Sequence, residues 1–307
     1  MTFIKPIEFY EYLILKHKPE ATKINMTQKE LFLNNSIIYY NNEKTFLFLG
    51  FSHQRLSEET IDAFSSLLKH FVPQTVLFEF DESIPIDKVG KFSTRVDEIG
   101  IGVRLSFLLN SQIRGIDLPK TEFLKIFSDY DKKNYKGIEL GVYWNFVNIY
   151  RYFKKIMENN KNEEVFEKVS QILEWEFLNE KGSLYSYKNE FLELIKKYSI
   201  DIKEGFKRFI EEQNIKNTGK QFSEIKDYDQ LTVPFPYCTK YPINRASTYL
   251  EAHRNVHIIE NIFKELEKNN CVASIIGTGH VSECKDILSD MLYKKFGMQM
   301  KRLSELK

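Results

Sequence analysis

The chain has 307 residues, and its 44 Lys and Arg against 43 Asp and Glu give a formal net charge of +1. This balance argues against electrostatic attraction of the whole molecule to nucleic acid or to an anionic membrane. A hydrophobic fraction of 42% can fill the core of a sizeable domain. Three cysteines without a Cys-x-x-Cys pair favour free thiols in a reducing compartment.

Charges interrupt the amino-terminal sequence too early for the apolar centre of a signal peptide. No stretch approaches the ~20 apolar residues that a membrane-spanning helix needs. We therefore expect a cytoplasmic protein that binds neither nucleic acid nor a membrane. The sequence leaves the oligomeric state open.

The first third of the chain predicts short helices and then strands that alternate with helices. Residues 1–35 are expected to form one or two helices, and residues 37–40 and 45–49 a hairpin across a turn that starts with two asparagines. A helix with Ser57 as its cap follows and ends before Pro73, because apolar residues recur at helical spacing up to that proline.

Two further strands continue this pattern. Residues 75–80 and 113–117 have the sequence of buried strands, and residues 97–109 between them have that of a helix. Strands that alternate with helices usually pair in parallel through right-handed connections. We therefore expect an α/β fold with a central, mostly parallel β-sheet and flanking helices.

Residues 121–230 differ from this core because they are rich in charge and predict helices without a convincing strand. We interpret them as a helical insertion, with the aromatic residues between 143 and 153 in its own core. Pro234, Pro236 and Pro242 predict an extended return to the sheet, because proline disrupts both helices and sheet interiors.

The end of the chain resumes the α/β pattern. Residues 247–268 predict a helix, residues 272–276 a strand, and the remainder a final helix that Ser282 could cap and Gly297 could end. The predicted domains are residues 1–35, an amino-terminal helical segment; residues 36–120 and 231–307, the α/β core; and residues 121–230, the helical insertion.

Two Gly-x-x-His tetrads follow predicted strands near opposite ends of the chain. They are Gly50-Phe51-Ser52-His53 and Gly277-Thr278-Gly279-His280. Glycine permits a sharp turn from strand to helix, and ligands of open α/β sheets bind at the carboxyl ends of the strands. One such tetrad is frequent by chance, but two in matching contexts favour a functional site.

Two carboxylates are predicted at the same edge of the sheet, because Glu79 and Asp117 lie at the ends of two other strands. We expect His53, Glu79 and His280 to converge in one pocket. Two histidines and one carboxylate are a recurrent ligand set for Zn²⁺, Mn²⁺ or Fe²⁺, and they leave a position for an activated water. Without a metal, one histidine could act as general base while Arg254 or the other histidine stabilises an oxyanion.

His253 and His257 stand four residues apart in the predicted helix around residue 250, hence on one face. A metalloprotease helix has Glu directly after its first His, whereas this chain has Arg254 there. We therefore expect packing or solvated roles for the two histidines. Arg254 could still reach the pocket and bind an anionic group.

Several motifs occur in the order and spacing of one protein group. They are Gly50-Phe51-Ser52-His53, the run from Pro73 to Glu79, Glu98 at a helix start, Gly115-Ile116-Asp117, Arg254-Asn255, and Gly277-Thr278-Gly279-His280. Together they resemble the pattern of the Tiki/TraB/PrgY group and its relatives, the ChaN-like proteins and the erythromycin esterases. The resemblance covers roughly residues 45–119 and 247–284, and Asn255 stands where the group usually has Asp.

This resemblance implies a hydrolase-like scaffold. Animal Tiki proteins are regarded as metal-dependent proteases, TraB and PrgY proteins counteract peptide pheromones, and erythromycin esterases open a lactone without an obligatory metal. Some relatives occur with genes for modified peptides, where a leader-peptidase role is suspected. We expect the chain to lack the membrane anchor of the animal and TraB-type proteins, because no stretch of the sequence is long and apolar enough to provide one.

The sequence therefore predicts a hydrolase, and specifically a metal-assisted peptidase that acts on a peptide or protein, such as a leader peptide. The expected catalytic residues are His53, Glu79, Arg254 and His280, of which both histidines and Glu79 would bind Mn²⁺, Co²⁺ or Zn²⁺. The expected substrate contacts are Glu98, Asp117 and Asn255. The alternatives are a module that binds a peptide or haem without turnover, and a metal-independent esterase.

Overall fold

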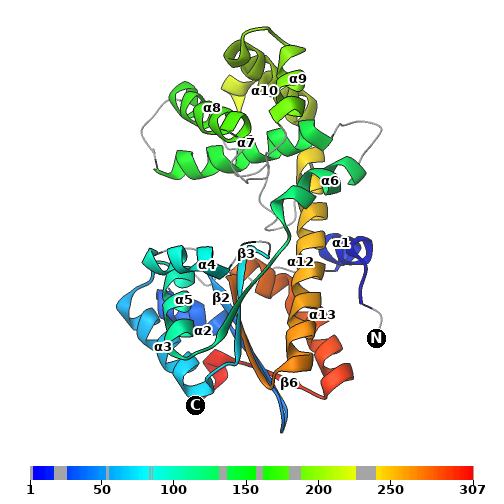
Figure 1. Ribbon diagram of the computed structural model, residues 1–307. Coiled ribbons are helices and arrows are strands. Elements are labelled where there is room, and N and C mark those ends of the chain that lie inside the picture. The colour runs from blue at the N-terminus through cyan, green and yellow to red at the C-terminus, as the bar shows by residue number, and fades with distance from the viewer. Residues whose placement is uncertain are drawn as a thin grey trace. The chain divides into compact units, whose positions relative to one another are not determined.

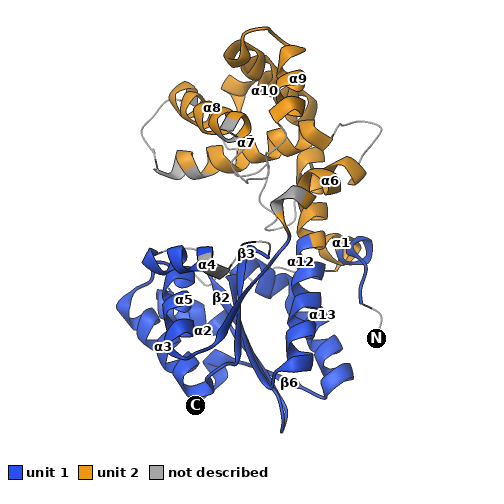
Figure 2. Cartoon of the chain, in the orientation of Figure 1, with its two compact units in different colours: residues 1–9, 17–118, 254–307 blue, residues 10–16, 119–253 orange. Residues whose placement is uncertain are grey.

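A computed structural model describes residues 3–16, 26–52, 55–82, 84, 86–130, 137–156, 162–179, 188–225 and 240–306 (Figure 1). The chain forms two compact units (Figure 2). Unit 1 comprises Met1–Phe9, His17–Leu118 and Arg254–Lys307, and unit 2 comprises Tyr10–Lys16 and Pro119–His253. The boundary between the units at Leu118 and Pro119 lies close to the start of the predicted insertion. The predicted return near residue 231 lies outside the described residues. The second boundary between the units lies between His253 and Arg254, within the helix Pro242–Lys268.

Unit 1 is built on a mixed, mostly parallel six-stranded sheet with the order β4-β3-β5-β2-β1-β6, which confirms the α/β class. Strands β4, β3, β5 and β2 are parallel neighbours, whereas β1 is antiparallel to both β2 and β6. The predicted hairpin is β1 and β2. The strands are β1 Ile37–Tyr40, β2 Thr45–Phe51, β3 Thr75–Asp81, β4 Gln112–Asp117, β5 Cys271–Gly277 and β6 Gln299–Arg302.

Helices cover both faces of this sheet (Figure 1). On one face, α2 (Gln28–Asn34), α3 (Glu58–Phe71) and α5 (Glu98–Leu108) bury apolar side chains in a single core with alternate residues of the strands. On the other face lie α12 (Pro242–Lys268) and α13 (Thr278–Phe296). Their backbone carbonyls accept hydrogen bonds from β1 and from the turn that follows it, as when Tyr39 Oη donates to Lys285 O at 3.3 Å and Lys44 Nζ to Leu266 O at 2.7 Å.

The remaining elements are helical. Within the described residues, unit 2 includes α6 to α10 and no strand, as the sequence predicts for this region, and its aromatic side chains Tyr143, Phe146 and Tyr150 are completely buried. No helix of the described ranges combines the length and apolar character needed to cross a membrane. The other bounds are α1 Pro6–Leu15, α4 Ile86–Val89, η1 Gly90–Thr94, α6 Lys120–Tyr130, α7 Gly137–Ile156, α8 Asn162–Asn179, α9 Lys188–Lys196, α10 Ile202–Thr218, η2 Phe222–Glu224 and η3 Leu303–Glu305.

Helix ends confirm two of the predicted caps and correct two other predictions. The Ser57 hydroxyl accepts the Thr60 N–H at the start of α3, and Gly297 ends α13 with φ of +66°. Pro242 is not extended but is the first residue of α12, a position where its missing N–H is not needed. Ser282 does not cap the last helix, which begins four residues earlier at Thr278.

The glycines of the two tetrads serve different needs. Gly50 lies inside β2, and a Cβ there would be 2.5 Å from the Asn35 carbonyl oxygen, so close packing requires this glycine rather than a turn. A Cβ on Gly279, in the first turn of α13, would meet only Glu283 Oε1 at 3.7 Å. The second tetrad therefore has room for a side chain where the first has none.

We accordingly expect Gly50→Ala to lower the free energy of unfolding by about 2 kcal/mol, the usual cost of overpacking against fixed backbone. Gly279→Ala is the matched control and should change it by less than about 1 kcal/mol. Urea unfolding of both variants measures the difference. Equal losses would show that Gly50 does not sit in the close contact with Asn35.

Candidate functional site

The carboxyl edge of the sheet in unit 1 brings together four of the residues singled out in the sequence. Glu79 is near the end of β3, Asp117 is the last residue of β4, Arg254 is on α12, and His280 is in the first turn of α13. Their side chains are 12%, 14%, 15% and 6% exposed, respectively. They are therefore largely screened from water, and their charges interact more strongly than surface charges do.

An irregularity of β3 accompanies the position of Glu79. Phe78 pairs with Gly115 of β4, but the next pair is Asp81 with Asp117, so β3 has one additional residue there. The pairing of β3 with β5 also ends at Phe78. Bulges next to functional sites commonly redirect a side chain. Here Glu79 Oε2 accepts the Gly277 N–H at 2.5 Å, and the carboxylate supplies the cap that α13 lacks from its own Gly277.

The other oxygen of Glu79 contacts both nitrogen-bearing side chains of the edge. Arg254 Nη2 donates to Glu79 Oε1 at 3.0 Å, and His280 Nε2 is 3.2 Å from the same oxygen. Arg254 also forms a two-bond fork with Asp117, from Nε to Oδ1 at 2.9 Å and from Nη2 to Oδ2 at 2.7 Å. Such bidentate pairs fix geometry as well as charge, so Arg254 holds both carboxylates in place.

A second chain of hydrogen bonds fixes the His280 ring from its other side. His280 Nδ1 is 2.6 Å from Asn255 Oδ1, and Asn255 Nδ2 donates to Glu283 Oε2 at 2.5 Å. A carboxylate only accepts, so the amide must present its nitrogen to Glu283 and its oxygen to His280. His280 Nδ1 therefore carries a proton and donates it to Asn255.

This tautomer determines what the other ring nitrogen can do. With the proton on Nδ1, neutral His280 turns the lone pair of Nε2 toward the Glu79 carboxylate oxygen, which also has only lone pairs to offer. Two acceptors at 3.2 Å need a proton or a cation between them. The proton is carried either by the ring or by the Glu79 carboxyl group, and the alternative is a bound metal ion.

We refer to Glu79, Asp117, Arg254, Asn255, His280 and Glu283 as the edge cluster. Its three carboxylates carry three negative charges against one positive charge on the guanidinium, which leaves a net charge of −2 when His280 is neutral. Asn255 is completely buried, and Glu283 and His280 are nearly so. Excess negative charge in so little solvent favours binding of a proton or a metal ion.

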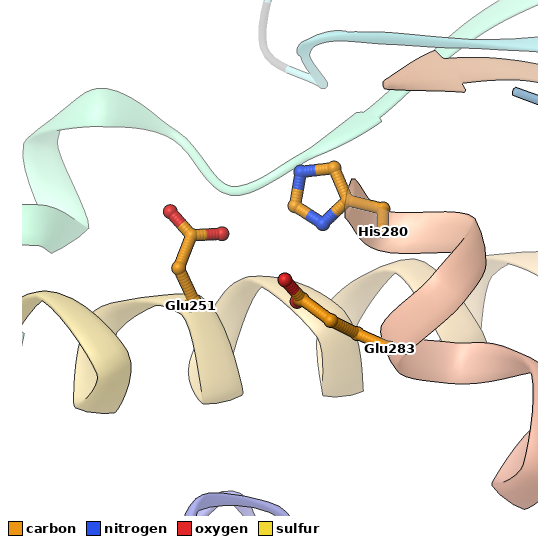
Figure 3. A group of neighbouring side chains, drawn as sticks. All are labelled: Glu251, His280 and Glu283. Carbon is orange, nitrogen blue, oxygen red and sulfur yellow. The ribbon is translucent and has the colours of Figure 1, made fainter. Parts of the chain in front are cut away.

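One group of ligand atoms was missed in the sequence. Glu251, His280 and Glu283 could together hold a metal ion, since one nitrogen or oxygen of each lies within 4.8 Å of the others (Figure 3). This group shares His280 with the expected metal set of His53, Glu79 and His280. Helical spacing was the available signal, because Glu283 lies three residues after His280 and Glu251 four before Asn255.

Three other expected site residues have different outcomes. His53 lies outside the described residues. Glu98 is buried in the first turn of α5, the helix that covers the face of the sheet opposite α12. Asn255 was expected to contact substrate, and in the structure its side chain has 0% exposure and lies between His280 and Glu283.

The two helix histidines do not form a metal pair in the structure. In unit 2, the His253 ring packs against Tyr249 with 4.7 Å between ring centroids, and burial lowers the pKa of His253. In unit 1, His257 Nε2 lies 3.0 Å from Glu82 Oε2, and Asn261 Nδ2 lies 3.0 Å from the same nitrogen. The packing predicted for His253 is confirmed, and His257 belongs to a separate polar contact.

Comparison of the chain with models of protein families, with curated proteins and with solved structures gave no match. The fold class follows from the sheet, and a function must be inferred from the edge cluster itself. The chemistry available there is carboxylate and imidazole coordination or proton transfer, next to a guanidinium that already holds two carboxylates.

Proposed function

We propose that the chain is a hydrolase, most consistent with a metal-assisted peptidase, and that the edge cluster is its active centre. The observation that carries the proposal is the fixed His280 ring: Asn255 Oδ1 accepts the hydrogen bond from Nδ1–H, so Nε2 faces Glu79 Oε1. The resemblance of the ordered motifs to the Tiki/TraB/PrgY group supports the same reaction class. A peptide or protein is the substrate class that this resemblance implies.

A divalent ion fits the geometry between His280 and Glu79. Ligands bound to zinc at about 2.0–2.1 Å in a tetrahedron lie about 3.3 Å apart, and the distance from Nε2 to Oε1 is 3.2 Å. The net charge of the cluster favours a cation as well. Glu79 and His280 would be ligands, with His53 proposed as the third ligand from the sequence. When bound, the ion would activate a water and polarise the scissile carbonyl.

The remaining residues would position these two. Asn255 selects the tautomer that leaves Nε2 available, and Glu283 orients the Asn255 amide. Arg254 fixes the Glu79 carboxylate through the oxygen that also faces His280. Because the same Nη2 also donates to Asp117, orientation of Glu79 describes Arg254 better than the oxyanion role expected from the sequence.

Metal loading tests this function. Wild-type protein dialysed free of metal and then offered Mn²⁺, Co²⁺ or Zn²⁺ should retain about one ion per chain, since both candidate ligand sets include His280. His280→Ala should weaken binding at least about tenfold, as loss of a ligand does. His70→Ala is the control, because His70 is exposed in the last turn of α3. Elemental analysis and titration of ion uptake provide the measurements.

Activity is measured on the same samples with a fluorogenic peptide mixture. Cleavage that a chelator abolishes and added metal restores supports the proposal. Cleavage by a metal-free wild type that is lost in His280→Ala would replace it with histidine general-base hydrolysis, in which Nε2 of the neutral ring accepts a proton from the attacking water. If the protein neither took up an ion nor cleaved a peptide, the hydrolase would be rejected and a binding module would remain.

A further inference from the structure

The sheet of unit 1 ends at β4, and no strand of the described residues pairs with its outer side. Gln112 N–H donates to Gln74 O on the inner side at 2.9 Å. Backbone groups of successive strand residues point alternately to the two sides. The amides of Ile113 and Gly115 therefore point away from β3, toward the open edge.

A cavity of 350 Å³ follows this edge. On the α12 side it is lined by Leu77, Asn261 and Glu265, and on the other side by Ile84 and Val89, which belong to or pack against the core under α5. Four successive residues of β4 itself, from Ile113 to Ile116, also line the cavity, so it runs along that strand. The exposed backbone of β4 thus lies in a groove rather than on a convex surface.

The two walls of the groove differ in chemistry. The α12 wall presents the carboxylates of Glu82 and Glu265 and the amide of Asn261, with Arg114 Nη1 3.2 Å from Glu265 Oε1. Glu265 is also paired with Lys268, whose Nζ lies 3.3 Å from Glu265 Oε1, whereas the partner of Glu82 is the His257 ring, so Glu82 is the carboxylate of this wall that favours a basic guest side chain. The opposite wall, with Ile84 and Val89, is apolar. A strand alternates its side chains between two faces, so a guest strand with basic side chains on one face and apolar side chains on the other matches one wall with acidic groups and one apolar wall.

We propose that β4 binds an extended peptide segment as an added strand, with basic side chains toward Glu82 and apolar side chains toward Ile84 and Val89. Added strands obtain affinity from main-chain hydrogen bonds and specificity from pockets for alternate side chains. β4 ends at Asp117 of the edge cluster, so a segment bound there continues to that cluster. A role of this bound segment in cleavage rests on the proposed function, whereas binding of the segment to β4 does not.

Backbone N-methylation provides the test. The probe is a fluorescent octapeptide of alternating lysine and valine, with one isomer N-methylated on every lysine and another on every valine. In an added strand only one of these two sets of amides faces β4. Anisotropy titrations in chelator, where cleavage cannot contribute, should show at least a tenfold loss of affinity for one isomer and less than a threefold loss for the other. Equal effects of both isomers, or no binding of the parent peptide, would overturn the proposal.

Two further readouts locate the bound peptide. Hydrogen exchange followed by NMR should slow at the Ile113 and Gly115 amides when the peptide binds, and unchanged exchange at both would also overturn the proposal. Glu82→Lys should weaken binding at least fivefold, and Glu82 is exposed enough that the variant should fold. Protected amides without cleavage after metal is restored would count against the hydrolase and leave strand addition standing.

Discussion

Replacement of Arg254 by alanine should lower the free energy of unfolding by about 3 kcal/mol, the lower part of the range for breaking a largely buried ion pair. The reason is that Glu79 and Asp117 would keep their negative charges at 14% exposure or less and lose the guanidinium that they share. Urea unfolding at neutral pH measures the loss. The same variant should also loosen Glu79, so metal affinity should fall.

Two controls isolate this effect. Arg254→Lys keeps the positive charge but not the planar fork that reaches both Asp117 oxygens, so it should recover part of the lost stability. Lys294→Ala removes an exposed ion pair with Asp290 in the same unit and should cost at most about 0.5 kcal/mol. If Arg254→Ala cost no more than Lys294→Ala, the fork would have no structural role.

Asn255→Asp should be nearly as damaging, although it restores the residue that the Tiki/TraB/PrgY pattern usually has. An aspartate at this completely buried position would face the Glu283 carboxylate, which now accepts from the Asn255 amide. Unfolding experiments should show a loss of about 3 kcal/mol at pH 8, because buried like charges are left uncompensated. The loss should be smaller at pH 5, where the two carboxylates can share a proton.

A second substitution, Glu283→Gln, should rescue the Asn255→Asp variant. In the double variant the introduced aspartate would accept from His280 Nδ1 and from the new glutamine amide, so the direction of the second hydrogen bond is reversed and one negative charge remains. Stability should return to within about 1 kcal/mol of wild type, and the double-mutant cycle should show strong coupling. If the loss of stability in the double variant equalled the sum of the losses in the two single variants, the hydrogen-bond chain would be contradicted. Asn255 would then have only a packing role.

The parts of the site that the sequence predicted share one property, which is their place at a strand end. Glu79, Asp117 and His280 each follow or end a buried apolar run, and parallel strands place such positions at one edge. The sheet class and the helical character of the middle region were predictable for the same reason, since hydrophobic periodicity reports local structure directly.

What the sequence did not predict depends on contacts between distant segments. Glu283 has no motif of its own, and its importance becomes visible only when α12 places Asn255 between it and His280. The sequence around Gly50 suggests a turn, because no neighbouring residue indicates that the Asn35 carbonyl packs against this glycine. Pro242 was read as a helix breaker, although the same fixed φ suits the first residue of a helix.

The position of β5 between β2 and β3 has a consequence for synthesis of the protein. The centre of the sheet comes from one of the last strands to leave the ribosome, so β2 and β3 lack their shared neighbour while the chain from Asp81 to Cys271 is made. At about 5–20 residues per second that interval is roughly 10–40 s. Two apolar strands then have unpaired inner edges, and we expect these edges to expose the nascent chain to aggregation until residue 277 has emerged.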